Sequence, residues 1–417
     1  MRREPSSYRC HAMRNRPTVT RAVRNSRLFF AGMLIGDLAY QVQSVAIAWH
    51  IFMLRHRPFD LGLVGLALFL PALLFALPAG VVSDRVDRRA LVAGTQCLEA
   101  VAVAALVLAI VYGERGLGVY LAILTVVGSA RAFGVPAERS LLPNIVPLER
   151  YLRAQATYSS LRQLIVIGGP ALGGLLVAAS TPVALALASV ALVISSYLLA
   201  WLQIVRTVST APPTLRDAFE GLRFVWSRPV VGAAISLDLF AVLFGGATAL
   251  LPAFADGVFH LGPTGLGLLR SAPAVGAALV AGYLARHPPR RHVGPLLLLC
   301  VAAFGAATIA FGLSRNVGLS LALLAVAGGS DMVSVVIRNG LVQLGTPDAM
   351  RGRVNAVENV FIGASNELGA FESGTLAAFV GVVPSVVLGG AGTLAIIAIW
   401  SLVFPALRRA DEIGPAA

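Results

Sequence analysis

The sequence contains no lysine and little charge of any kind, since Asp, Glu and Arg together make up 13% of its 417 residues. Hydrophobic residues account for 57% of the chain, and the mean hydropathy is +0.80. These values lie far outside the range of soluble domains. Apolar runs of about 20 residues, enough to cross a ~30 Å hydrocarbon core, follow one another almost without pause. The composition excludes a soluble protein with a single anchor and predicts a polytopic helical membrane protein.

Several kinds of chemistry have no signature in the chain. The three cysteines, Cys10, Cys97 and Cys300, lie in a tail and two separate spans, so neither a metal site nor a disulfide is expected. The histidines show no ligand spacing, and no glycine-rich phosphate loop of the Walker type is present. We therefore expect no enzymatic activity, no metal, no cofactor and no use of ATP. Residues 1–27 lack the apolar core of a signal peptide and are expected to form a cytoplasmic tail, with Met13 as an alternative start.

The net charge of +13 would suit a nucleic-acid partner, but the positions of the arginines give a better explanation. If the N-terminus is cytoplasmic, most arginines, Arg338 among them, fall in the tails and the even-numbered loops. Only Arg55, Arg57, Arg115 and Arg315 fall in loops on the other side. This asymmetry follows the positive-inside rule. It predicts a bacterial cytoplasmic-membrane protein with both termini in the cytoplasm, in contact with membrane lipids and not with nucleic acid.

The apolar runs predict an all-α protein of twelve transmembrane helices with short outer loops. The expected spans are 28–54, 61–83, 90–113, 117–138, 157–179, 182–204, 229–255, 264–285, 293–313, 317–338, 354–380 and 384–407. A long connection, 205–228, separates a first half (28–204) from a second half (229–407), and residues 408–417 form a second cytoplasmic tail. Apolar positions at helical spacing after Pro212-Pro213 predict an amphipathic helix in the connection, lying on the inner membrane surface.

Landmarks recur at a nearly constant offset, which indicates two copies of one six-span unit. Asp37 and Asp238 are 201 residues apart, Pro71 and Pro273 are 202 apart, and Arg153 and Arg353 are 200 apart. Repeated bundles of this kind place their substrate site at the interface between repeats, near the bilayer midplane.

With this organisation, the chain resembles the major facilitator superfamily over nearly its whole length after the tail. Residues 133–143, 346–356 and 361–374 resemble, more narrowly, the branch that contains the enterobactin exporter and macrolide-efflux-like proteins. The resemblance implies a secondary transporter in which two six-helix halves rock about a central cavity.

A charged loop after the second span resembles the first signature of that superfamily, G-x-x-x-D-R-x-G-R-R. Its residues are Gly80, Asp84, Arg85, Arg88 and Arg89. The resemblance implies an inner-side latch that favours the outward-open state; anchoring by positive charge alone is the alternative. Asp87 replaces the usual glycine, and the second copy carries Arg286 in place of Asp84. The second latch is therefore expected to be degenerate.

The fifth span contains the core of a signature associated with antiporting members. It consists of Gly169, Pro170, Gly173 and Gly174. The resemblance implies antiport, whereas ordinary close packing of small residues is the alternative.

Ionisable residues inside spans are the sharpest functional signal, because a charge in hydrocarbon is costly without a partner or a function. The candidates are Asp37, Glu99, Arg131, Asp238, Arg270, Asp331, Glu358, Glu367 and Glu372. Glu99 is interpreted as structural. The acids of the eleventh span, Glu358, Glu367 and Glu372, are expected to contact substrate or to bond between helices.

The first and fourth spans of each half line the cavity in the resembled superfamily, so we expect Asp37 to pair with Arg131. The repeat then places Asp238 and Asp331 together as two acids. We expect that acidic pair, tempered by Arg270, to carry the proton, and Asp37 with Arg131 to gate or orient the substrate. Structural hydrogen bonding of Asp238 or Asp331 is the alternative.

These features predict an exporter of a small, partly apolar molecule, such as a drug, macrolide or siderophore, driven by proton antiport. A proton-coupled importer and a membrane sensor without transport activity on the same fold are the alternatives. Neither the substrate nor the oligomeric state follows from the sequence.

Overall fold

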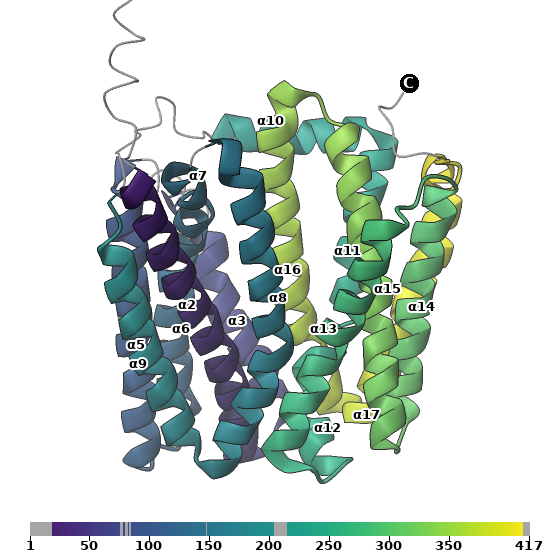
Figure 1. The fold of residues 1–417 in the computed structure, drawn as a ribbon. Helices are drawn as coiled ribbons and strands as arrows, with labels where there is room; N and C mark the ends of the chain where they lie inside the picture. The colour runs from purple at the N-terminus through teal and green to yellow at the C-terminus, as the bar shows by residue number, and fades with distance from the viewer. Residues whose placement is uncertain are drawn as a thin grey trace, which may run out of the picture.

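The structure is a computed structural model that describes residues 19–75, 78–79, 82, 85–146, 148–203 and 215–411. Within these ranges the secondary structure is helical and contains no strand. Most of the expected N-terminal tail and the Pro212-Pro213 break lie outside the described residues. The helices form two bundles side by side, and both ends of the described chain lie at the same end of the molecule, here called the termini end (Figure 1).

The first half contains the six expected long helices. They are α2 (Val19–Arg55), α3 (Pro58–Leu74), α5 (Arg88–Val111), α6 (Leu117–Arg139), α8 (Leu148–Ala179) and α9 (Thr181–Ala200), with the short α7 (Leu142–Ile145) between α6 and α8. Helix α8 begins at Leu148, nine residues before the expected start of the fifth span at 157. Its added turns carry charged and polar residues that hydropathy alone does not assign to a span.

The second half begins after the connecting helix α10 (Leu215–Ser227). Its elements are α11 (Pro229–Phe244), η1 (Ala247–Leu250), α12 (Leu251–Gly257), α13 (Gly262–Arg286), α14 (Val293–Leu313), α15 (Val317–Leu344), α16 (Asp348–Val380), α17 (Val382–Val403) and α18 (Pro405–Arg408). The expected seventh span, 229–255, corresponds to α11, η1 and α12 together, with the helix broken at Gly245-Gly246. A Cβ atom on Gly246 would lie 2.6 Å from the carbonyl oxygen of Gly369, so the break lets α16 approach closely.

Ten helices in the described part of the chain are long and apolar enough to cross a membrane, with α11 to α12 counted as one. The two further spans are α3, which is apolar but 17 residues long, and α16, which has 33 residues and more polar ones. Many large apolar side chains on the outer faces are exposed, as lipid-facing helices require. The twelve-helix architecture in two repeats expected from the sequence is therefore confirmed.

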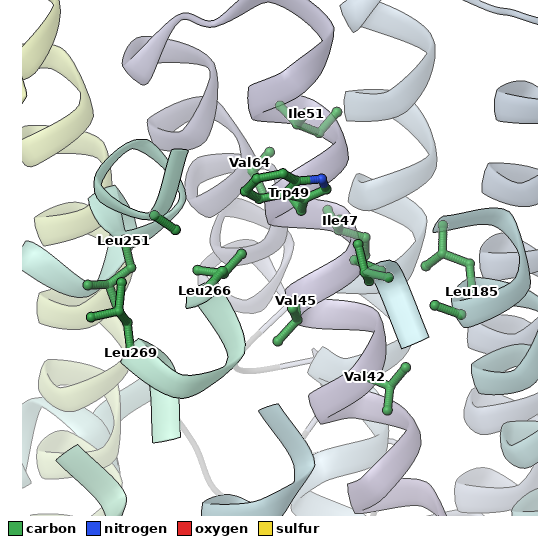
Figure 2. Packing of buried hydrophobic residues seen from close by; sticks show 14 of the residues in the cluster. Val42, Val45, Ile47, Trp49, Ile51, Val64, Leu185, Leu251, Leu266 and Leu269 are labelled. Carbon is green, nitrogen blue, oxygen red and sulfur yellow. The ribbon is translucent and has the colours of Figure 1, made fainter. Parts of the chain in front are cut away.

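One buried apolar core joins the two halves at the end opposite the termini. Trp49 of α2 and Val64 of α3 belong to the same cluster as Leu251 of α12 and Leu266 of α13 (Figure 2). At the termini end the cores are separate: Phe29 and Leu141 belong to a first-half cluster, whereas other buried residues form second-half clusters of their own. The halves are thus held together at one end and have independent interiors at the other.

Facing glycines make the contact between the halves close. A Cβ atom on Gly174 of α8 would lie 3.0 Å from the Cα of Gly267 on α13. A Cβ atom on Gly374 of α16 would lie 2.9 Å from the backbone nitrogen of Gly62 on α3. Small residues at such crossings allow backbones to touch, so two helix pairs, α8 with α13 and α3 with α16, form the seam.

Helix α10 lies within the expected connection and packs against the second half. Val225 of α10 shares a buried cluster with Val354 and Val357 of α16. Glu220 forms an ion pair with Arg353, 2.9 Å between Oε2 and Nη1. The connection is therefore fastened to α16 at the termini end.

Candidate functional site

A polar cluster built around Arg131 lies inside the first half. The Arg131 guanidinium stacks over the ring of Tyr40, 3.8 Å from the centroid. Its Nη1 atom lies 3.6 Å from Oε1 of the buried Glu99. Gln43 donates a hydrogen bond of 2.5 Å to that same carboxylate oxygen. Glu99, which appeared isolated in the sequence, is thus the carboxylate that balances Arg131.

The direct partners of Asp37 are other residues, so the expected ion pair with Arg131 is wrong, although the two are close enough to interact electrostatically. Its carboxylate accepts a hydrogen bond of 2.9 Å from the Tyr158 hydroxyl and one of 3.3 Å from Nε of Arg162. Both partners belong to α8 and are four residues apart, which puts them on one helix face. Both partners fall inside the expected fifth span, 157–179, but nothing in the sequence showed that this face of the helix turns toward Asp37.

Arg270 of α13 reaches across the interface between the halves. Its Nη1 atom lies 3.3 Å from Oγ of Ser44 on α2, and the Ser44 hydroxyl in turn donates to the carbonyl oxygen of Gln41, at 2.9 Å. Glu367 of α16 is close enough to interact electrostatically with Arg131 and Arg270. Its Oε2 atom would lie 3.1 Å from a Cβ placed on Gly65 of α3, so this glycine leaves room for the carboxylate. Groups from both halves therefore meet at one place.

The second half contains a buried ion-pair network that the sequence did not reveal. Arg338 of α15 is 4% exposed and pairs with Asp238 of α11 and with Glu358 of α16, where Nε lies 3.4 Å from Oε1. The expected pair of Asp238 with Asp331 is therefore wrong. The interpretation of Arg338 as a loop arginine is also wrong. Helix α15 continues to Leu344, so Arg338 lies within the helix and is buried. Arg338 lies 100 positions after Asp238 and 20 positions before Glu358. Residues so far apart in the sequence share no local pattern, so the sequence did not predict that they would pair.

The remaining intramembrane acids are less constrained. Asp331 of α15 is half-buried, and no hydrogen bond or ion pair to its carboxylate occurs within the described residues. Within the part of the chain that the structure describes, the one hydrogen bond to Glu372 of α16 comes from the neighbouring Ser373 hydroxyl, at 3.3 Å. Asp331 thus remains available to a ligand or a proton.

The charged loop after the second span is described only in part, because Gly80 and Asp84 lie outside the described residues. Arg89 donates to the carbonyl oxygen of Leu202 beyond α9, at 2.9 Å, and pairs with Asp87 at 3.2 Å. Asp87 also caps α5 by accepting from the Arg89 backbone nitrogen. Arg85 and Arg88 begin the same segment, exposed and half-buried respectively. The aspartate that replaces the usual glycine therefore starts a helix and holds Arg89 toward the end of α9.

The glycine-rich motif of the fifth span lies in the middle of α8 and faces two neighbours. Gly169 approaches Gln41 and Gly173 approaches Val42, both on α2, whereas Gly174 faces α13. Pro170 is buried at the same seam, since a Cβ on Gly267 would lie 2.6 Å from its carbonyl oxygen. The motif thus allows α8 to pack closely against α2 of the same half and against α13 of the other half.

Among the residues that the structure describes, no group of three or more His, Cys, Asp or Glu side chains is placed to hold a metal ion. The chemistry available at the interface is that of guanidinium, carboxylate, hydroxyl and aromatic groups. These can bind and release a charged or polar molecule, and the carboxylates can exchange protons.

Comparisons with known proteins agree with this arrangement. A family model described as transmembrane secretion effector matches residues 22–415. The enterobactin exporter EntS of Escherichia coli O1:K1 / APEC is 27% identical over 402 residues, covering 93% of this chain and 94% of the relative. The multidrug efflux pump Tap of Mycolicibacterium fortuitum is 28% identical over 371 residues, covering 84% and 88%.

Solved structures show the same fold at low sequence identity. A bacterial homologue of the human lysosomal transporter Spinster, in an inward-facing and unoccupied conformation, gives a TM-score of 0.70 at 14% identity, covering 92% of this chain and 96% of that one. A bacterial homologue of the iron transporter ferroportin, in an inward-facing state, gives 0.70 at 16% identity, covering 94% and 100%.

Proposed function

This chain belongs to the transmembrane secretion effector family of the major facilitator superfamily, and from that membership and the geometry of its interface we propose a secondary exporter. It moves a small, partly apolar molecule out of the bacterial cytoplasm in exchange for protons. The export direction rests on the relatives, which are named as an enterobactin exporter and a multidrug efflux pump.

The observation that carries the proposal is the meeting of charged groups from both halves. Arg270 of the second half bonds to Ser44 of the first, while Arg131 and Glu367 lie close by on opposite halves. In repeated bundles, a site between the repeats can be exposed to one side and then the other by rocking of the halves. A ligand bound there would contact both halves, so its contacts would change when the halves move relative to each other.

The distribution of buried cores supports alternating access. A shared core and two glycine seams hold the halves together opposite the termini, and separate cores lie at the termini end. If the halves rocked about this interface, they could separate at the end with the shared core and meet at the termini end. Neither bundle would have to unpack. With the termini in the cytoplasm, as the arginine distribution favours, this conformation is closed to the outside.

The halves are proposed to comprise residues 28–204 and 229–407, with the connection 205–228 between them and cytoplasmic tails at 1–27 and 408–417. The attachment of α10 to α16 through Glu220 and Arg353 supports a connection that moves with the second half. Basic residues of the tails and of this connection would contact anionic lipid headgroups.

Proton coupling is proposed to involve Asp331. Asp238 is held by Arg338, so protonating it would break a buried ion pair. Asp331 is half-buried without such a partner among the described residues, and it can take up and release a proton without dismantling a network. Asp37, which accepts hydrogen bonds from Tyr158 and Arg162, is proposed to position the first half's share of the site.

The function is tested by measuring transport in everted membrane vesicles that contain the full-length protein. A panel of siderophores, macrolides and other antibiotics is supplied with an imposed proton gradient. We expect at least one compound to accumulate in the vesicles, with accumulation abolished by an uncoupler and absent from vesicles without the protein. Proton-driven depletion of preloaded compound would instead indicate an importer. No protein-dependent movement of any compound would indicate a sensor and overturn the proposal.

A further inference from the structure

Arg270 occupies an unusual position for a guanidinium inside a membrane bundle. It lies nine residues into α13 from Gly262, well inside the helix that ends at Arg286. Its hydrogen bond goes to the uncharged hydroxyl of Ser44, and within the described chain no carboxylate oxygen lies within 4.0 Å of its nitrogens. Three other arginines discussed above on spanning helices differ: Arg131 has Glu99, Arg162 has Asp37, and Arg338 has Asp238 and Glu358.

A half-buried cation such as Arg270, inside a membrane bundle and without a close counter-ion, costs free energy. A guanidinium has five N–H donors and keeps its charge at any physiological pH. Arg270 is half-buried among helices, and the hydroxyl of Ser44 satisfies only part of its donors, so the others are left to water or to a ligand. Such a residue is stabilised when an anion enters the site, so its present geometry favours a ligand that carries negative charge.

The groups around Arg270 indicate what the rest of that ligand is like. Tyr40 presents an aromatic ring on the first-half side, already covered on one face by Arg131. Ser44 supplies a hydroxyl on the same helix, one turn away. A planar apolar body can pack near Tyr40 while its anionic group bonds to the fork of donors on Arg270.

We propose that Arg270 is the substrate anchor of this transporter and that the transported molecule is a small organic anion, with a carboxylate or similarly charged group attached to an aromatic or apolar body. This inference rests on the proposed function, since it assigns the class of molecule that the exporter moves. It also gives Glu367 a role: this carboxylate is the resident counter-charge, near Arg270 and Arg131 but outside ion-pair distance of either. A bound anion competes with it for the two arginines.

The test uses two probes that share one aromatic body and differ in charge, 2-naphthoate and the uncharged 2-naphthamide. The full-length protein is reconstituted in lipid nanodiscs, and its thermal unfolding midpoint is followed as each probe is added, because a ligand of the folded state raises that midpoint. We expect 2-naphthoate to stabilise the wild-type protein at lower concentration than 2-naphthamide does.

Variants of the site should change the affinity for 2-naphthoate in opposite directions. Arg270→Gln should weaken it about 10- to 100-fold, the range for loss of a hydrogen bond to a charged group. Arg270→Lys should retain part of it, since the charge remains without the fork geometry. Glu367→Gln should strengthen it, because the competing carboxylate is gone. Arg286→Gln is the matched control on the same helix. Arg286 is exposed, and among the described residues its side chain bonds to the carbonyl oxygen of Gly282, one turn earlier, so its loss should leave binding unchanged.

Two results would overturn the inference: equal stabilisation of wild-type protein by both probes, or undiminished 2-naphthoate binding in Arg270→Gln. If Arg270→Gln fails to fold, the other two variants provide the test. Arg270→Lys should weaken 2-naphthoate binding and Glu367→Gln should strengthen it, and the absence of both changes would refute the inference. Failure of the proposed function looks different, because it is the absence of any transport in vesicles. An exporter that moves only cationic or neutral compounds would keep the function and refute the anionic substrate.

Discussion

Asp37 and Asp238 occupy equivalent positions in the two repeats, 201 residues apart, yet their carboxylates have different partners. Asp37 is half-buried and accepts hydrogen bonds from Tyr158 and Arg162 of the same half. Asp238 is buried and pairs with Arg338. The same acid is therefore adaptable in one half and fixed in the other.

The repeat explains how this asymmetry arises. The position equivalent to Arg338 at an offset of 200 is Glu138, and the position equivalent to Glu358 is Tyr158. The first half thus has an acid and a phenol at the positions where the second half has the base and the second acid of its three-residue network. Because the first half has no base at that position, Asp37 pairs instead with Arg162, an exposed residue of α8.

The first prediction compares these equivalent aspartates. Asp238→Asn leaves Arg338 buried with one carboxylate fewer, and breaking a buried ion pair costs about 3–5 kcal/mol. Asp37→Asn, in its half-exposed set, should cost well under half of that. The measurement is thermal or denaturant unfolding of purified protein in one detergent. Equal losses from the two variants would show that the buried network contributes no special stability.

A second prediction concerns the seam between α8 and α13. Gly174→Val places a branched side chain against the backbone of Gly267 and should force the halves apart at the end opposite the termini. The distance between spin labels at positions 56 and 256 reports the separation, since His56 and Asp256 approach within 3.8 Å across the halves. The distance distribution should shift to longer values.

Gly168→Val supplies the matched control for this seam, because a Cβ atom on Gly168 meets nothing within 4 Å. It should leave both the label distance and transport unchanged. An unaltered distance in Gly174→Val would mean that the glycine motif does not hold the halves together.

The third prediction separates proton coupling from substrate movement. Asp331→Asn should abolish accumulation driven by a proton gradient but retain exchange of labelled for unlabelled compound, because the substrate site itself is intact. Glu372→Gln, on α16, is the comparison variant and should reduce proton-driven transport much less. If Asp37→Asn alone removes the dependence on the gradient while Asp331→Asn keeps it, the proton site lies in the first half.

The fourth prediction concerns the loop that resembles the superfamily signature. Asp84→Asn should leave expression and insertion intact but impair transport, since a charge-assisted bond of about 1–3 kcal/mol shifts a conformational equilibrium about 5- to 100-fold. Asp87→Asn is the neighbouring control: its ion pair with the partly exposed Arg89 is of the surface kind, worth about 0–1 kcal/mol. Normal transport by a well-expressed Asp84→Asn protein would leave the loop as a lipid anchor only.

The fifth prediction fixes the orientation. A reporter enzyme that is active only in the periplasm, fused after residue 410, should give no signal, because the arginine-rich loops and both termini are expected on the cytoplasmic side. The same reporter inserted after Arg115, in the short loop between α5 and α6, should be active. The reverse pattern would invert the topology and, with it, the side of the membrane on which the two halves have separate cores.

The sequence by itself determined the parts of this protein that depend on local properties. The length of an apolar run decides whether a helix can span the membrane, and the offset between Asp37 and Asp238 reveals the repeat. Likewise, an ionisable residue such as Arg270 inside an apolar run carries a free-energy cost in the membrane. That cost can be recognised from the sequence without knowing which way the side chain points. These features led to the twelve-helix fold, the superfamily and most of the residues now found at the interface.

Only the tertiary structure decided which of those residues meet. Arg338 pairs with Asp238 and Glu358 because three helices turn these side chains toward one another, and Arg131 takes Glu99 rather than Asp37 for the same reason. Helix rotation and tilt are set by packing against neighbours, as at Gly174 and Gly267, and not by hydropathy. A hydrophobic pattern fixes how deep a residue lies in the membrane, but the partner of a buried charge depends on all the helices that surround it.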